Sequence, residues 1–270
     1  MKKIALALAL SLVSIGQAFA QSDEGAQVGD DETSAFVGGI ATYNSDYLGS
    51  DQESLGALPY VSVQNFKGLD LFGTSLSYRA FETGTGAGLG KWSLRAGPNL
   101  TYQSGRDSDD SPTLTGLKDV DFSVLAGGYI RGTFGPVGVR LDAGQDIIGG
   151  HDGAVANASV GTFLPLGKLN IQPSASLNWG SANHNQSFFG INQEQSNASG
   201  LAVNDLDSGV FGYSVNLISW YELSDDYVIT AIGSHRWFTN DAKGSPILLA
   251  ADGSDTGMFF ALGIARKFSL

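Results

Sequence analysis

The sequence Lys91–Gln103, KWSLRAGPNLTYQ, alternates apolar and polar side chains. Successive side chains of a β-strand point to opposite faces, so this segment predicts a strand with an apolar face from Trp92 to Tyr102 and a polar face from Ser93 to Gln103. At about 3.3 Å per residue and a tilt of about 40°, Trp92 and Tyr102 lie about 25 Å apart along a bilayer normal, the spacing of two aromatic girdles. A strand of a soluble β-sandwich alternates in the same way, so the other segments must decide.

The other segments repeat this alternation and show no helical periodicity. In Leu169–Gly180, every second side chain is apolar and the others are polar or glycine. Long polar connections alternate with short turns along the chain; the long ones are 104–118, 181–208 and 239–256. Long outer loops and short periplasmic turns are typical of outer-membrane barrels, and a sheet in lipid must close because unpaired backbone groups are costly there. The sequence therefore predicts an all-β fold, a transmembrane antiparallel up-and-down β-barrel.

The number of strands is the least certain feature of this barrel. Eleven segments alternate, but a bacterial single-chain barrel has an even number of strands. Counting from either end places the conflict between Asn44 and Gln103, where one segment is split, merged or missed. We predict twelve strands, with ten as the alternative. Pro98 and Pro173 have no N–H to donate to a ladder, and each predicts a bulge.

The N-terminal residues have the pattern of an export signal. A basic start (Met1–Lys3) precedes the apolar run Ile4–Ile15 and an A-x-A site, Ala18–Ala20. This pattern predicts a cleaved secretory signal peptide over residues 1–20. Residues 21–33 are polar and acidic and predict a mobile N-terminal arm, and residues 34–270 form the predicted barrel. No later stretch reaches about 20 apolar residues, so no transmembrane helix is expected.

The composition of the chain argues against several kinds of partner and reaction. Without the signal peptide the chain has 13 basic and 27 acidic residues, a formal charge of −14, which argues against a nucleic-acid partner. The sequence has no cysteine, which excludes disulfides and thiol chemistry. The glycines between Gly84 and Gly90 precede a strand and are not followed by the Lys-Ser/Thr pair of a phosphate-binding loop. We therefore expect no cofactor.

The three histidines do not indicate an enzyme. His151, His184 and His235 lack the spacing of metal ligands, so no metal site is expected. His184 shares a loop with Ser187, which could serve a lipase-like pair, but polar residues of a surface loop are the simpler interpretation. We predict that the protein is not an enzyme and that it has no catalytic, cofactor-binding or metal residues.

Short motifs follow one another along the mature chain. They are Tyr43–Asp51 with Leu58-Pro59, Gly105-Arg106 with Leu114, Gly116 and Leu117, Gly150–Gly153, Phe188–Ile191 with Ser199–Leu201, and Ser245–Ile247. In this order they resemble the outer-membrane family of the MltA-interacting protein (MipA) and OmpV. The resemblance implies a protein of the Gram-negative outer membrane, in contact with lipid and lipopolysaccharide. It also implies a scaffold that brings a lytic transglycosylase together with a penicillin-binding murein synthase. Other members resemble small porins or surface adhesion factors, and the family has no catalytic residues to transfer.

Charged side chains occupy the expected inner face. They are Arg79, Arg95, Asp121, Arg131, Arg140 and Asp142. Such side chains either pair and fill a small barrel or line a narrow path for solutes. The sequence does not decide between a filled and an open lumen.

Overall fold

The structure is a computed structural model that describes residues 33–86 and 88–270, and its strands close into one barrel. The expected signal peptide and residues 21–32 of the expected arm lie outside the described residues. The strands are β1 Ser34–Ser45, β2 Glu53–Phe66, β3 Leu69–Phe72, β4 Ser75–Tyr78, β5 Phe81–Gly84, β6 Trp92–Gln103, β7 Ser123–Phe134, β8 Val137–Asp146, β9 Ala154–Thr162, β10 Leu164–Leu166, β11 Leu169–Gly180, β12 Gly209–Glu222, β13 Tyr227–Phe238 and β14 Thr256–Ser269.

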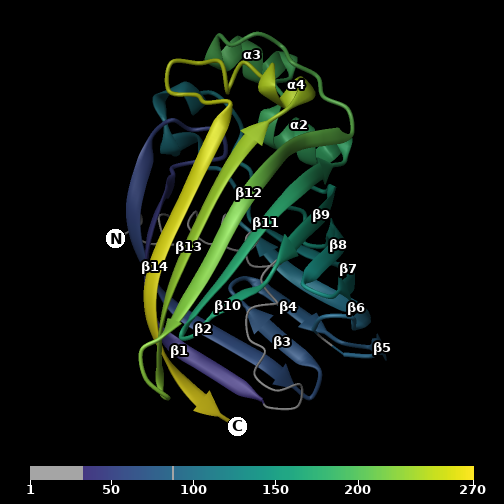
Figure 1. The fold of residues 1–270 in the computed structure, drawn as a ribbon. Helices are drawn as coiled ribbons and strands as arrows, with labels where there is room; N and C mark the ends of the chain where they lie inside the picture. Colours follow the sequence, from purple (N-terminus) through teal and green to yellow (C-terminus); the bar gives the residue numbers. More distant parts are fainter. Residues whose placement is uncertain (1–32, 87) are drawn as a thin grey trace.

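Each strand pairs with its neighbours in the sequence, and the pairing of β1 with β14, from Ser34↔Ser269 to Asn44↔Phe259, closes the sheet. All ladders are antiparallel. β4 and β5 both pair with β6, and β9 and β10 both pair with β11, so each of these pairs is one interrupted strand of the barrel. The protein is therefore a closed, twelve-stranded up-and-down barrel, as predicted (Figure 1).

The odd strand count arose from the segment 69–80, which the alternating pattern joins into one strand. The structure divides it at Gly73-Thr74 into the hairpin β3–β4, in which Phe72 faces Ser75. Gly73 has φ +57°, a left-handed conformation that glycine adopts readily. The turn reverses the faces: Phe72 packs inside the barrel, whereas Leu76 is exposed on the outside. The merged segment lies between Asn44 and Gln103, where the conflict was located.

Both prolines interrupt a neighbouring strand. Between the pairs Ser77↔Asn99 and Phe81↔Ala96, residues 78–80 stand opposite 97 and 98 only, which is the predicted bulge. The bulge brings the Tyr78 carbonyl so close to Gly97 that an added Cβ would lie 1.7 Å from its oxygen. At Pro173 the ladder is interrupted between β9 and β10 without an extra residue, so the predicted bulge is replaced by a simple gap.

The alternation in β6 corresponds to two faces. Trp92 and Leu100 are exposed on the outer surface, whereas Ser93, Asn99 and Gln103 are buried inside. Exposed aliphatic residues cover the outer surface of the other strands too; examples are Val139, Leu141, Val160, Leu177, Val215, Leu217, Leu262 and Ile264. This is the surface that a bilayer would cover.

Within residues 33–86 and 88–270, helices occur only in the connections at one end of the barrel, opposite the C-terminus (Figure 1). They are α2 Ala182–Phe189, α3 Gln193–Ser199, α4 Asn240–Lys243 and the two 3-10 turns Ser108–Asp110 and Pro112–Leu114. The sequence had indicated irregular loops here. Among the residues that the structure describes, no helix is long and apolar enough to cross a bilayer.

Leu262 lies half-way along β14 and is 50% exposed on the outer face. Leu262→Arg should lower the free energy of unfolding by about 2–4 kcal/mol in lipid vesicles, because a charge near the bilayer midplane is costly. Leu177→Arg, next to Trp179 of the outer girdle, should cost less. Urea titrations in vesicles measure both, and Leu249→Arg in an exposed loop is the control. Equal, small costs at all three sites would contradict a lipid-facing surface.

Candidate functional site, a loop cap over a two-sided lumen

The long loops form a packed cap over the extracellular end of the barrel. Its apolar core is drawn from four loops and two strand ends: Tyr47, Leu114, Leu117, Val120, Phe188, Phe189, Ile191, Leu206, Phe211, Phe238, Ala242, Ile247 and Leu248. Phe189 and Ile191, from the longest loop, are fully buried although they lie outside the barrel wall. A core of this kind holds the loops in one arrangement over the mouth.

Arg106 ties the 104–122 loop to helix α2. Its side chain is buried, and Nη1 donates to the carbonyl oxygen of Phe188 at 2.7 Å. The backbone of Arg106 forms a two-hydrogen-bond bridge with Val120, which closes the loop at its base. Burial lowers the pKa of Arg106 to about 10, so the side chain keeps its charge at neutral pH. A buried cation bonded to a helix C-terminus is costly to displace, so this contact holds the cap together.

Asp252, from the last loop, makes a second link across the mouth. Its carboxylate accepts hydrogen bonds from the Ser111 and Thr113 hydroxyls, and its carbonyl accepts one from Tyr47 Oη at 3.2 Å. Ser245 Oγ of the same loop donates to the Phe189 carbonyl at 2.6 Å. Four loops that are far apart in the sequence are thereby joined.

Gly116 lies where two loops touch. Its φ is +86°, and an added Cβ would lie 2.7 Å from the backbone of Ala198 in α3. Only glycine fits both the left-handed conformation and this approach.

The structure brings two of the three histidines together. The rings of His151 and His184 are 5.0 Å apart, edge to face, and both are buried under the cap. Asp146 Oδ2 accepts the backbone N–H of His151 and so fixes the first of them. No group of three or more His, Cys, Asp or Glu side chains within the described residues is arranged to hold a metal ion.

His184 is held as a neutral base. Its Nδ1 is 3.1 Å from Asn185 Oδ1, so Nδ1 carries the proton and Nε2 accepts from the Gln103 amide at 3.3 Å. Burial, and after it the neighbouring His151, lowers the pKa of His184 to about 3. A second proton would place an N–H against the Gln103 amide N–H as it is oriented here, so protonation of His184 requires the Gln103 amide to turn over.

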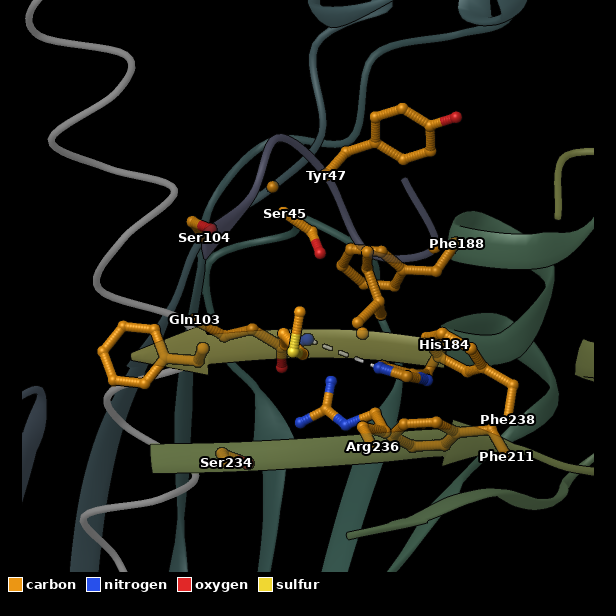
Figure 2. A pocket seen from close by; sticks show the side chains of 16 residues that line it. Ser45, Tyr47, Gln103, Ser104, His184, Phe188, Phe211, Ser234, Arg236 and Phe238 are labelled. Carbon is orange, nitrogen blue, oxygen red and sulfur yellow. Dashed lines mark hydrogen bonds between the residues drawn. The ribbon is translucent and has the colours of Figure 1, made fainter. Parts of the chain in front are cut away.

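A small cavity lies beneath the cap. Figure 2 shows His184 and Arg236 pointing into it, with Gln103 bonded to His184 and aromatic side chains around them. Its volume is about 60 Å³. That is enough for a few water molecules and too little for a typical ligand. The packed loops therefore cover the mouth of the barrel, and the cavity beneath them is small.

Below the cap, one side of the lumen is cationic. Arg95, Arg131 and Arg140 are directly opposite one another in the ladders of β6, β7 and β8 and form a row. Arg140 binds Asp142 at 2.7 Å and stacks on the Tyr129 ring at 4.4 Å. This row with Asp142 is named the cationic arc. It contains four of the six charged residues that the sequence placed on the inner face.

The other two predicted residues lie elsewhere. Arg79 sits between β4 and β5, and it shares Glu82 with Arg95 at the periplasmic end, at 2.9 Å and 2.6 Å. Asp121 is exposed in the loop before β7, not on the inner wall where the sequence had placed it. The strand begins only at Ser123 because Val120 is held by its backbone bridge to Arg106 within the same loop.

The opposite side of the lumen is apolar, which the sequence did not predict. Its buried residues come from β12, β13, β14, β1 and β2: Phe36, Ile40, Leu58, Tyr60, Ile218, Val228, Ile232, Phe259, Ala261 and Ala265, with Phe72 and Trp220 packed against them. This cluster is named the apolar arc. In the order of the strands, β14 at its centre is half-way round the barrel from β7. The lumen is thus two-sided.

Comparison with known proteins agrees with this architecture. The family model described as MltA-interacting protein MipA matches residues 37–268. The chain belongs to the MipA family. Outer membrane protein Omp26La of Vibrio anguillarum and OmpV of Vibrio cholerae are each 25% identical to it over 93% of this chain and 95% of theirs. It is therefore an outer-membrane protein.

Solved outer-membrane proteins are similar at low identity. The COG4313 outer membrane channel of Pseudomonas putida F1 has a TM-score of 0.43 and 11% identity over 90% of this chain and 100% of that one. OprB of Pseudomonas putida has a TM-score of 0.42 and 8% identity over 88% and 94%.

Apart from Leu58-Pro59 on β2, the motifs on which the MipA resemblance rests lie in or directly under the cap. Tyr47, Arg106, Gly116, Phe189 and Ile247 each belong to one of them, and all five make the contacts described above. The sequence had indicated polar surface loops here. The missed signal was the presence of Phe188–Ile191 and Ile247 in otherwise polar segments.

The buried His184 predicts a pH-dependent cap. Its pKa of about 3 lies below the ordinary 6.5, so an opened cap binds a proton that the closed cap does not. The equilibrium constant for closing the cap is therefore highest above about pH 6.5. It falls by up to about tenfold for each pH unit as the pH drops from 6.5 towards 3. Hydrogen exchange of α2 at pH 7 and pH 5, corrected for intrinsic rates, measures this. His184→Gln should flatten the dependence and His235→Gln, on β13, should not. An equal dependence in wild type and His184→Gln would contradict it.

Proposed function

We propose that this outer-membrane barrel is a non-enzymatic docking scaffold for peptidoglycan-remodelling enzymes, a lytic transglycosylase and a penicillin-binding murein synthase. The observation that carries the proposal is the packed cap: loops that form a buried core over the mouth make the protein unsuited to be a permanently open pore. The family is named for interaction with MltA, which supports a partner of this class for the present chain.

The periplasmic end provides the surface for such a partner. Its connections are short and exposed, and one of them, 223–226, contains Asp225 and Asp226 beside the exposed Leu223. The connection before β6 contains Leu89, whose side chain is 88% exposed. The exposed Leu89 offers a partner an apolar contact. The carboxylates of Asp225 and Asp226 in the other turn offer charged groups for the rim of the same interface.

Site-specific photocrosslinking in cells tests the scaffold. Benzoylphenylalanine placed at Leu89 and at Asp225 should give adducts with a lytic transglycosylase and a murein synthase. The same residue at Leu249, which is 70% exposed in an extracellular loop, is the matched control and should give none. The absence of both enzymes from the periplasmic adducts would overturn the proposal.

Solute diffusion is a second candidate, favoured by the cationic arc. Buried arginines on one wall of a lumen suit a narrow polar path, provided that the cap moves aside. Wild-type protein in planar bilayers should then show little conductance at neutral pH, and deletion of 182–206, which removes α2 and α3, should produce stable channels. Silence of the correctly folded deletion variant would remove this candidate.

A further inference from the structure

The ring of strands is wider than the side chains beside the cationic arc can fill. Twelve strands spaced about 4.8 Å apart and tilted by about 40° form a ring about 24 Å across, whereas about eight strands give an interior that side chains alone just fill. The inner positions of β9, β11 and β12 next to the arc are short polar side chains: Asn157, Ser159, Ser176, Ser214 and Asn216. The lumen beside the arc is therefore wide enough for a segment of extended chain.

The cationic arc favours an anionic occupant. Its three arginines and one carboxylate give it a formal charge of +2. Arg131 and Arg140 lie near the periplasmic ends of β7 and β8, and the cap covers the opposite mouth, so the arc is approached from the periplasm. Less water surrounds a charge inside a barrel than on its rim, so an anion is attracted more strongly to the arc than to the exposed basic side chains of the turns.

The chain itself supplies an anionic segment on the periplasmic side. Residues 21–32, between the predicted cleavage site and the first described residue, have the sequence QSDEGAQVGDDE. They contain five carboxylates and no lysine or arginine. Fully extended, twelve residues span about 40 Å, which exceeds the width of about 24 Å across the ring. The acidic arm is therefore long enough to reach the arc on the far side of the barrel.

A row of contacts leads from the root of the arm to the arc. Thr33 Oγ1 donates to the Asn65 carbonyl at 2.9 Å, and the side-chain oxygen of Asn65 accepts from the guanidinium of Arg79. Arg79 and Arg95 share the carboxylate of Glu82. Since Arg95 belongs to the cationic arc, the point at which the arm leaves the barrel and the beginning of the arc lie along one polar row.

We propose that the acidic arm, residues 21–32, turns into the barrel and lies against the cationic arc. Asp23 and Glu24 are about 30 Å of extended chain from the first described residue, which is far enough to reach Arg131 and Arg140. The tether at the rim gives the arm a high effective concentration at the arc, which favours it over an acidic segment of another chain. The docking requires no partner enzyme and is independent of the scaffold role.

Disulfide linking in the purified, folded protein tests the docking. The chain has no cysteine, so Gly25→Cys in the arm can be paired with Ser159→Cys, which faces the lumen opposite Arg140. With copper phenanthroline as the oxidant, this pair should link several-fold faster than Gly25→Cys with Val160→Cys, whose position is on the outer face of the same strand. Peptide mapping by mass spectrometry identifies the link. Linking that is no faster with Ser159→Cys than with Val160→Cys would overturn the proposal.

Neutralising the arm tests whether charge holds it. Asp23→Asn with Glu24→Gln should slow the linking to Ser159→Cys several-fold, because the attraction to the arc is lost. Asp205→Asn with Asp207→Asn changes the net charge by the same amount at two exposed positions of an extracellular loop, and it should leave the linking rate unchanged. Equal linking rates in the two double variants would contradict an electrostatic docking.

Labelling of a single cysteine provides a test that leaves the barrel wall unaltered. In the folded protein in detergent micelles, Gly25→Cys should react with a bulky maleimide several-fold more slowly than Leu89→Cys, whose position is 88% exposed in a periplasmic turn. In urea-unfolded protein the two cysteines should react at equal rates, which excludes a difference in intrinsic reactivity. Equal rates in the folded protein would overturn the docking, whatever enzymes the periplasmic turns are found to bind.

Discussion

The structure depends on one constraint: inside a bilayer, backbone N–H and C=O groups must find partners within the protein or in enclosed water. Eleven of the twelve junctions between neighbouring barrel strands join segments that are adjacent in the sequence, and the remaining one, β1 with β14, joins its two ends. The constraint also explains the two proline positions, where a missing N–H coincides with an interrupted neighbour strand.

The two ends of the barrel differ in kind. At the periplasmic end the chain reverses in short turns, because antiparallel neighbours need only a few residues to connect. At the extracellular end, long loops contribute Phe188, Phe189 and Ile247 to a core that lies outside the barrel wall. The buried Arg106 and the carboxylate of Asp252 then fix how the loops cross. A cap built in this way behaves as a small folded unit whose stability can differ from that of the barrel.

The lumen combines two environments that sheet geometry keeps apart. Arg95, Arg131 and Arg140 are neighbours across three strands, and carboxylates such as Glu82 and Asp142 balance part of their charge. The apolar arc lies half-way round the ring, so neither environment neutralises the other. The lumen of this closed barrel is thus two-sided beneath a cap of packed loops.

The sequence by itself determined the architecture. A period of two with one apolar face, repeated over segments such as Lys91–Gln103 and Leu169–Gly180 and combined with long polar loops that alternate with short turns, predicted a membrane barrel. The sequence pattern did not reveal the turn at Gly73-Thr74. When 69–80 is taken as one strand, Phe72 lies on the same face as Leu76 and Tyr78. In the structure the turn places Phe72 on the opposite face from them.

Tertiary structure alone decided the rest of the site. The alternating pattern of β7 extends back to Asp121 in the sequence, but the strand itself begins at Ser123. The bridge between Arg106 and Val120 in the preceding loop sets this boundary. Whether a loop is solvated or packed, and whether an inner face is polar or apolar, depends on which distant segments meet. His151 and His184, 33 positions apart in the sequence and in contact in the structure, show that such meetings are set by closure of the barrel and cannot be derived from local spacing.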